Sequence, residues 1–286
     1  MMRLLLGFFC LISQVLAAPN IAVSIPPIHS IVSNITQGVS TPSLLLEAQQ
    51  SAHHFHLKPK QLSLIERSDL LVIVHPTFES GLAKIFQHTD PNNRLSVAPI
   101  DDEMHEAHGQ EVHEAHGQDP HLWLDIAQMK AFAHKLANKL IEIDPTHQSQ
   151  YLANLAKLEQ QLDNLHRHIK QQLSQAGNKS VATYSNAFDV LIDHYQLTHT
   201  ASVVEQHEQR PSIKNLLVAK QSMRQHQTEC LLTTTEVSPK QIHLLKENLS
   251  LNVARIDILG ANLNPGSDLY VRLMQHITKQ VRQCLQ

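Results

Sequence analysis

The sequence predicts an α/β fold in which two parallel-sheet lobes with flanking helices are joined by one long rigid helix. Three observations indicate this: short apolar strands alternate with helical patterns up to residue 100, a long amphipathic helix follows, and the alternation resumes after residue 177. The chain has 286 residues, of which 42% are hydrophobic and 17% charged. This length and composition allow one large or two modest domains with real cores, and they exclude a disordered or low-complexity protein.

Histidine is unusually frequent in this chain. There are 21 histidines, against 8 glycines and 1 tryptophan. Histidine is the commonest metal ligand and titrates near neutral pH, so this excess points to metal or proton handling. The net charge of −3, with histidine counted as neutral, argues against a nucleic-acid binder that uses a broad basic surface.

The first 17 residues have the pattern of a secretory signal peptide. Arg3 supplies a small positive region, residues 4–16 form an apolar stretch, and the small residues at its end suit cleavage after Ala17. A lipoprotein attached through Cys10 is a weaker alternative, because the apolar stretch continues past that cysteine. No other stretch approaches ~18 uninterrupted apolar residues, so we expect a soluble, exported mature protein.

The pattern up to residue 100 predicts the first lobe. Strands are expected at 21–25, 43–46, 70–74 and 95–98, and helices at 28–36, 60–66 and 81–87. The alternation stops at Ile100, where a polar, acidic and histidine-rich stretch begins. We therefore assign 1–17 to the signal peptide and 18–143 to the N-terminal lobe, which includes a histidine-rich loop at 101–120.

A long helix is expected to link the lobes. After a helix at 127–142, Pro145 suits the first turn of a second helix and Asp144 suits its N-cap. This helix runs to about residue 175 and Gly177 ends it, so the linking segment is 144–177. Apolar residues recur along it at spacings of three and four and form one stripe: Leu152, Leu155, Leu158, Leu162, Leu165 and Ile169.

The C-terminal lobe, at 178–286, repeats the alternation. Strands are expected at 181–184, 198–204, 230–233 and 253–256, and helices at 187–195, 213–226, 240–247 and 268–285. Cys230 and Cys284 remain after the signal peptide is removed, and in an oxidising compartment we expect them to form one disulfide. Two buried free thiols are the alternative; a zinc site that uses both is weaker, because no Cys-x-x-Cys spacing exists.

The ends of the predicted strands carry several side chains that can bind metal. In an open α/β sheet, ligands bind beyond the carboxyl ends of the strands, and two facing lobes would collect these ends in one cleft. The residues at these ends are His53, His75, Ser185, Glu205, His207, Thr234 and Asp257.

Two histidine motifs are the main candidates for metal ligands. One is the loop at 51–59, which contains His53, His54 and His56. One or two of these would bind metal, and an exposed polar loop is the alternative. The other is His121, in the segment His-Leu-Trp-Leu-Asp, where Trp123 and its neighbouring leucine would exclude water from a metal bond. Simple packing is the alternative for this segment.

The histidine-rich loop contains a short tandem duplication. The sequence His-Glu-Ala-His-Gly-Gln occurs twice, and its histidines are His105, His108, His113 and His116. Such a tract cannot bury a core but can hold metal loosely through imidazole and carboxylate groups, so we interpret it as an auxiliary, low-affinity metal site. A linker without a role is the alternative.

Asp257 would supply an oxygen ligand and negative charge for a divalent cation, and a cap or loop hydrogen bond is the alternative for its carboxylate. Catalytic motifs are absent: the sequence has no Gly-x-Ser-x-Gly elbow, no phosphate-binding glycine loop and no His-Glu-x-x-His. We therefore expect a binding protein and not an enzyme, without a nucleic-acid partner.

Together these motifs resemble the ZnuA-type periplasmic zinc-binding proteins of ABC metal importers. The resemblance covers nearly the whole mature chain. It rests on a His-x-Phe-x-Leu-Lys-Pro element at 53–59, Ser-Asp-Leu-Leu-Val at 68–72, the histidine-rich insert, His-Leu-Trp-Leu at 121–124, the long helix, Ile-Asp-Ile-Leu-Gly at 256–260 and the two C-terminal cysteines. It implies two α/β lobes bridged by a rigid helix, metal in the cleft between them, and a disulfide between those cysteines.

The resemblance also implies roles for single residues. His53 and His121 look like two of the family's imidazole ligands, and Asp257 looks like the carboxylate on or near the metal. The insert resembles the acidic, histidine-rich loop of the family's zinc-selective branch.

At one position the sequence departs from the family's pattern. The third ligand, a histidine or glutamate after the first strand of the C-terminal lobe, is replaced by Ser185. A serine hydroxyl is a poor zinc ligand, and Ser185 suits the N-cap of the next helix. Additional ligands are then expected from Glu205 or His207, which lie at the next strand end, or from the loop histidines His54 and His56.

We therefore expect a monomer that captures Zn²⁺ in the periplasm and delivers it to the permease of an ABC importer in the inner membrane. Mn²⁺ or another divalent metal is the second choice for the cargo. Two other functions remain open. One is a periplasmic zinc buffer or chaperone that acts through the histidine-rich loop. The other is a metal-dependent hydrolase whose open coordination position activates water.

Overall fold

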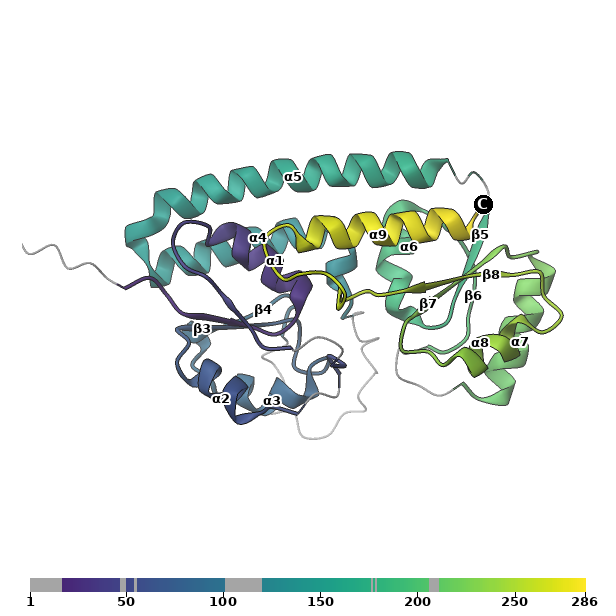
Figure 1. Ribbon diagram of the computed structural model, residues 1–286, viewed down its shortest axis with the longest axis horizontal. Coiled ribbons are helices and arrows are strands. Elements are labelled where there is room, and N and C mark those ends of the chain that lie inside the picture. The colour runs from purple at the N-terminus through teal and green to yellow at the C-terminus, as the bar shows by residue number, and fades with distance from the viewer. Residues whose placement is uncertain are drawn as a thin grey trace, which may run out of the picture.

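The computed structural model describes residues 17–46, 50–53, 56–100, 120–175, 177, 179–205 and 211–286. The predicted two-lobed α/β fold with a long connecting helix is confirmed there (Figure 1). Several predicted features lie outside the described residues: the signal peptide up to residue 16, His54, His105, His108, His113, His116 and His207.

The first lobe contains a parallel four-stranded sheet in the order β2-β1-β3-β4. The central strands β1 and β3 are buried at every residue, as expected where both faces of a parallel sheet are covered. At the edge, β2 pairs with β1 over two residues only, so it is shorter than predicted. The elements are β1 (Ile21–Val23), α1 (Pro26–Ile35), β2 (Ser43–Leu44), α2 (Pro59–Glu66), β3 (Leu70–Ile73), α3 (Ser80–His88) and β4 (Arg94–Ser96).

The second lobe repeats this arrangement with a parallel sheet in the order β6-β5-β7-β8. The edge strand β6 ends at Ser202, two residues before the predicted end, although the amides of Val203 and Val204 still donate to backbone carbonyls of the neighbouring chain segment. The elements are β5 (Ser180–Thr183), α6 (Asp189–Tyr195), β6 (Thr198–Ser202), α7 (Ile213–Gln225), β7 (Cys230–Thr234), α8 (Pro239–Lys246) and β8 (Asn252–Ile256).

Three longer helices form a layer that both sheets share: α4 (Ile126–Ile143), α5 (Gln148–Ser174) and α9 (Leu269–Cys284). In Figure 1, α5 runs along the molecule over both sheets and α9 lies beside it. With 27 residues, α5 is about 40 Å long, which is enough to span both lobes.

The start of the linking helix differs from the prediction. Residues Pro145–His147 form a 3-10 turn, and α5 begins only at Gln148. The Asp144 side chain makes no capping hydrogen bond, because its Oδ2 accepts from the Tyr151 hydroxyl at 2.8 Å and contacts His147 Nδ1 at 2.6 Å. Tyr151 thereby takes the buried position in this turn, and Leu152, predicted as part of the apolar stripe, is 44% exposed.

The C-terminal helix binds back to the N-terminal lobe. The Ser30 hydroxyl on α1 donates to the Ser267 carbonyl at 2.9 Å and accepts from the Tyr270 amide at 3.0 Å. The Tyr270 hydroxyl donates to the Trp123 carbonyl at 2.8 Å. One hydrophobic core accordingly continues from β1 to α9 through both lobes, while the predicted lobe boundaries at 143 and 177 remain predictions.

Cys230 and Cys284 form a disulfide with their Cα atoms 5.4 Å apart, which confirms that prediction. The bond joins the start of β7 to the last residue of α9. It therefore fixes the shared helical layer to the centre of the second sheet.

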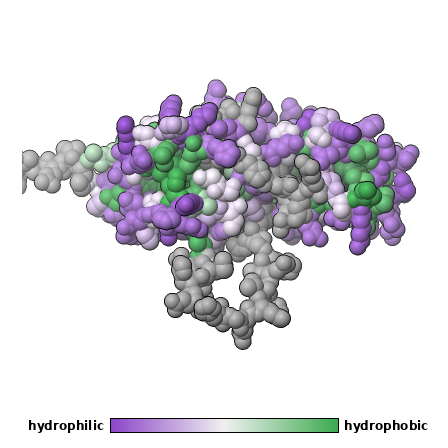
Figure 2. Space-filling view, turned by 90° about the horizontal axis from the view of Figure 1, so that it is seen from below, coloured by the Kyte–Doolittle hydropathy of each residue, from purple (hydrophilic) through white to green (hydrophobic). Residues whose placement is uncertain are grey.

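The face in Figure 2 is mostly hydrophilic, with separate hydrophobic patches. Large apolar side chains are exposed on helices of both lobes: Leu62 on α2, Ile213, Leu217 and Val218 on α7, and Leu244 on α8. In the described part of the chain, no helix is long and apolar enough to cross a membrane.

We expect the disulfide to contribute substantially to stability. The two cysteines are 54 residues apart, and closing a loop of that length in the unfolded chain corresponds to about 4 kcal/mol on the loop-entropy model. The double change Cys230→Ser and Cys284→Ser should therefore lower the urea concentration at which half of the protein is unfolded. Dithiothreitol should lower the wild-type midpoint to the same value and leave the double variant unchanged; a wild type insensitive to reduction would contradict the prediction.

Candidate metal site

A cavity of about 350 Å³ lies between the lobes, at the carboxyl ends of strands from both sheets. The N-terminal lobe contributes Gln50, Ala52, His53, Phe78, His121 and Trp123 to its lining. The C-terminal lobe contributes Thr234, Thr235, Glu236, Asp257, Ile258, Leu259, Ala261 and Asn262. Of the residues expected at strand ends, His53, Thr234 and Asp257 line this cavity, and the motif histidine His121 lines it as well.

The His121 ring is held among aromatic side chains. It is only 1% exposed, and its ring centre lies 5.1 Å from that of Trp123 and 5.5 Å from that of Phe78. Trp123 is itself fully buried, and its indole N–H donates to the Ile258 carbonyl across the cavity at 2.8 Å. This bond connects the segment that carries His121 to the residue that follows Asp257.

The His53 ring faces His121 at a distance that suits one shared metal ion. The two ring centres are 6.0 Å apart. Two imidazoles bound to one zinc ion with bonds of 2.0–2.1 Å have ring centres separated by roughly 5–6 Å. The Phe78 ring lies edge-on to the His53 ring with ring centres 4.2 Å apart, and the Ser80 hydroxyl donates to the His53 carbonyl at 2.6 Å. The loop after β3 therefore positions the His53 ring, and the start of α3 positions its backbone.

Asp257 follows β8 directly and organises the next turn. Its Oδ1 accepts from the amides of Leu259 at 3.1 Å and Gly260 at 2.8 Å, while Oδ2 has only a longer contact to the Asn262 amide at 3.4 Å. The loop hydrogen bonds considered as the alternative for this residue are therefore present. They involve mainly one oxygen, so the other remains chemically suited to a cation in the cavity.

Of the other predicted ligands that the structure describes, none lies in the cavity lining. Ser185 is 1% exposed and lies after β5 at the N-cap position of a 3-10 turn (Asn186–Phe188), but its side chain makes no capping hydrogen bond there, contrary to the prediction. Glu205 and His56 are absent from the lining, and the His75 ring contacts the Thr77 hydroxyl at 2.7 Å instead.

Glu236 lines the cavity and was not among the predicted ligands. It lies two residues beyond Thr234, the last residue of β7, so its position near a strand end is the signal in the sequence that points to it. The described part of the lining thus contains two imidazoles from one lobe and two carboxylates from the other. Among the described residues, however, no three side chains of His, Cys, Asp or Glu are grouped closely enough to hold a metal ion. Metal binding would therefore require these side chains to converge.

Comparison with known proteins identifies the family. The family model for ZnuA, the periplasmic component A of the zinc-uptake complex, matches residues 21–284. This chain belongs to the ZnuA family. A high-affinity zinc uptake system protein ZnuA from Brucella abortus (strain 2308) is 26% identical, over 98% of this chain and 96% of the relative.

Solved structures agree with the fold of this ZnuA-family chain. A crystal structure of ZnuA superposes with a TM-score of 0.77 at 21% identity, covering 94% of this chain and all of the other (100%). The solute-binding protein FpvC from Pseudomonas aeruginosa, in complex with Mn²⁺, has a TM-score of 0.77 at 17% identity, covering 93% and 98% of the two chains.

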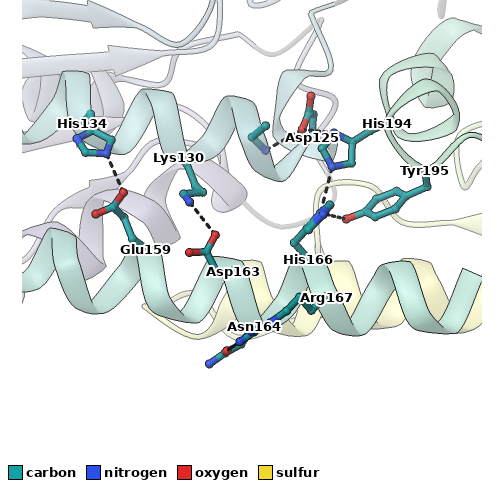
Figure 3. Close-up of polar contacts among 11 residues, drawn as sticks. Asp125, Lys130, His134, Glu159, Asp163, Asn164, His166, Arg167, His194 and Tyr195 are labelled. Carbon is teal, nitrogen blue, oxygen red and sulfur yellow. Dashed lines mark hydrogen bonds and ion pairs between the residues drawn. The ribbon is translucent and has the colours of Figure 1, made fainter.

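Beyond the cavity, a histidine cluster fastens the His121 segment of this family member to the rest of the fold (Figure 3). Asp125 begins α4 by accepting from the Ala127 amide at 2.7 Å, and it pairs with His194 of α6 at 2.9 Å. The other ring nitrogen of His194 lies 3.1 Å from Nδ1 of His166 on α5. Burial lowers the pKa of His166, and the adjacent His194 lowers it further. The cluster links both lobes to the long helix.

Glu79 is a buried carboxyl group behind the cavity wall. It is fully buried, and its Oε2 accepts from the amides of Val74 at 2.8 Å and His75 at 3.1 Å. Burial raises the pKa of Glu79 to about 7, although the two amides favour the charged form. It closes the loop that carries Phe78, so its charge state affects a segment in contact with His53.

We expect Glu79→Gln to change the pH dependence of stability. The folded pKa is about 7 and the ordinary value 4.5, so the folded protein binds more protons between these pH values. The Glu79 contribution to stability is therefore present below pH 4.5 and is lost as the pH rises towards 7. The free energy of unfolding of the variant minus that of wild type, measured by urea denaturation, should rise by on the order of 3 kcal/mol from pH 5 to pH 8. Parallel stability profiles for the two proteins would contradict this.

Proposed function

We propose that this chain captures Zn²⁺ in the cavity between its lobes and delivers it to the permease of an ABC importer. The observation that carries the proposal is the pair of imidazoles, His53 and His121, with ring centres 6.0 Å apart in a cavity that Asp257 also lines. Membership of the zinc-uptake family and the name of the Brucella relative support the same cargo.

Zinc is the proposed metal because two neutral imidazoles and carboxylate oxygens suit its four-coordinate sites. The Mn²⁺ complex of FpvC, which shares the fold, makes Mn²⁺ the second candidate. Capturing a metal ion makes and breaks no covalent bond of the protein. These residues therefore need only coordinate the ion, exclude water from it and release it.

We propose the periplasm as the place of action, with residues 1–17 directing export and cleavage near Ala17. The disulfide between Cys230 and Cys284 supports an oxidising compartment, where such bonds persist. We further propose that the protein acts as a monomer towards the permease, and that the histidine-rich loop gathers zinc at low affinity.

The proposal is tested by a chelator-competition zinc titration on the mature protein lacking residues 101–119. One site of nanomolar or tighter affinity is expected. His53→Ala and His121→Ala should each weaken it by roughly 100-fold or more, at least the loss caused by removing an outer-shell partner. As a control, His276→Ala, which replaces an exposed histidine of α9, should leave the zinc affinity unchanged.

The titration also separates this function from its competitors. If the protein binds zinc only at micromolar affinity and His53→Ala does not change that affinity, a zinc buffer that acts through the histidine-rich loop is favoured. Hydrolysis of generic esters or phosphates that disappears in His53→Ala would favour the metal-dependent hydrolase.

We expect zinc affinity to fall steeply below about pH 6, because protonated imidazole cannot bind metal. The same titration at pH 5 and pH 7 measures this. Equal affinity at the two pH values would show that histidines do not hold the metal.

A further inference from the structure

We propose that Glu236 is the second carboxylate ligand of the metal and compensates for the serine at position 185. The inference rests on the proposed function. It assigns the metal two imidazoles from the N-terminal lobe, His53 and His121, and two carboxylates from the C-terminal lobe, Glu236 and Asp257.

The composition of the cavity lining leads to this assignment. Among the described residues of the lining, only these four have side chains of the types that commonly bind zinc, and zinc most often takes four ligands. Thr234 and Thr235 also line the cavity, but a neutral hydroxyl is a weak ligand beside a carboxylate. Ser185 is both a weak ligand and outside the lining.

The backbone on both sides of Glu236 is fixed. The Arg255 guanidinium donates to the Thr235 carbonyl at 2.8 Å and to the Val237 carbonyl at 3.3 Å. The Thr235 amide donates to the Ile256 carbonyl at 3.2 Å, which ties the loop after β7 to the end of β8. Glu236 and Asp257 therefore come from two adjacent, mutually bonded strand ends, and a held backbone reduces the entropy lost when the Glu236 side chain binds metal.

Charge balance favours a second carboxylate. Two neutral imidazoles with Asp257 alone would leave a bound Zn²⁺ site with a net charge of +1, whereas a second carboxylate makes it neutral. His121 and Trp123 are buried whereas Glu236 is exposed, so an uncompensated charge is costly at the His121 side of the site. One oxygen of Asp257 already accepts two amide hydrogens, which further limits what that residue supplies alone.

Two carboxylates should also shift the metal preference. Carboxylate oxygens suit Mn²⁺ better than imidazole does, so a site with two of each discriminates less against Mn²⁺ than a site with three imidazoles. Glu236→His should therefore retain Zn²⁺ binding and lose Mn²⁺ binding, whereas Glu236→Gln should weaken both.

The test is a competition titration with Zn²⁺ and with Mn²⁺ on the full mature chain. Glu236→Gln should weaken Zn²⁺ binding by about tenfold or more. The matched control is Glu247→Gln, an exposed glutamate at the end of α8 in the same lobe, which should change affinity less than about twofold because distant exposed charges are screened. Ser185→Ala should leave affinity unchanged. Fluorescence of Trp123, the single tryptophan and part of the lining, checks that each variant responds to metal in the cavity.

The outcomes distinguish this inference from the proposed function. If His53→Ala and His121→Ala abolish binding while Glu236→Gln matches wild type, the role of Glu236 is overturned and the proposed function stands. If none of these variants alters zinc binding, the proposed function fails as well. A similar loss in Glu236→Gln and Glu247→Gln would show a general charge effect and would also overturn the assignment.

Discussion

The buried apolar stripe of α5 is the constraint on which the rest of this structure depends. Leu158, Leu162, Leu165 and Ile169 are almost completely buried, and α5 contacts α1, α4 and α9. A single helix about 40 Å long therefore sets the separation of the two sheets. Because all strands in each sheet are parallel, their carboxyl ends meet at one edge, and the shared helical layer holds these edges on either side of one cavity.

Trp123 connects this framework to the candidate ligands. Its carbonyl accepts from Tyr270 on α9, its indole N–H donates to Ile258, and its ring contacts His121. Two residues further on, Asp125 caps α4 and pairs with His194 on α6. The segment that carries His121 is thus bonded to elements of both lobes.

The two walls of the cavity differ in chemistry. The N-terminal lobe presents histidines among aromatic rings, and the C-terminal lobe presents carboxylates on hydrogen-bonded turns. In the proposed site, a serine at position 185 does not preclude metal binding, because another strand end of the same lobe carries Glu236. Replacing an imidazole by a carboxylate changes the charge and hardness of the donor set, so the consequence is expected in metal preference as well as in affinity.

The sequence by itself determined the alternation of strands and helices, the long linking helix, the cysteine pair, and His53, His121 and Asp257 as residues of one cleft. The strands and helices follow from local periodicity, and His53 and Asp257 from the rule that parallel strands end at one edge. His121 came from its own motif and from the resemblance to the ZnuA-type proteins. Only the tertiary structure decided that Tyr151 replaces Leu152 in the buried stripe, that Ser185 and Glu205 lie outside the cavity, and that Glu236 lies within it. The physical reason is that these outcomes depend on how the chain turns after each strand or helix. Arg255 donates to the carbonyls on both sides of Glu236, and the Tyr151 hydroxyl donates to Asp144. The hydrophobic periodicity along the chain does not encode these contacts.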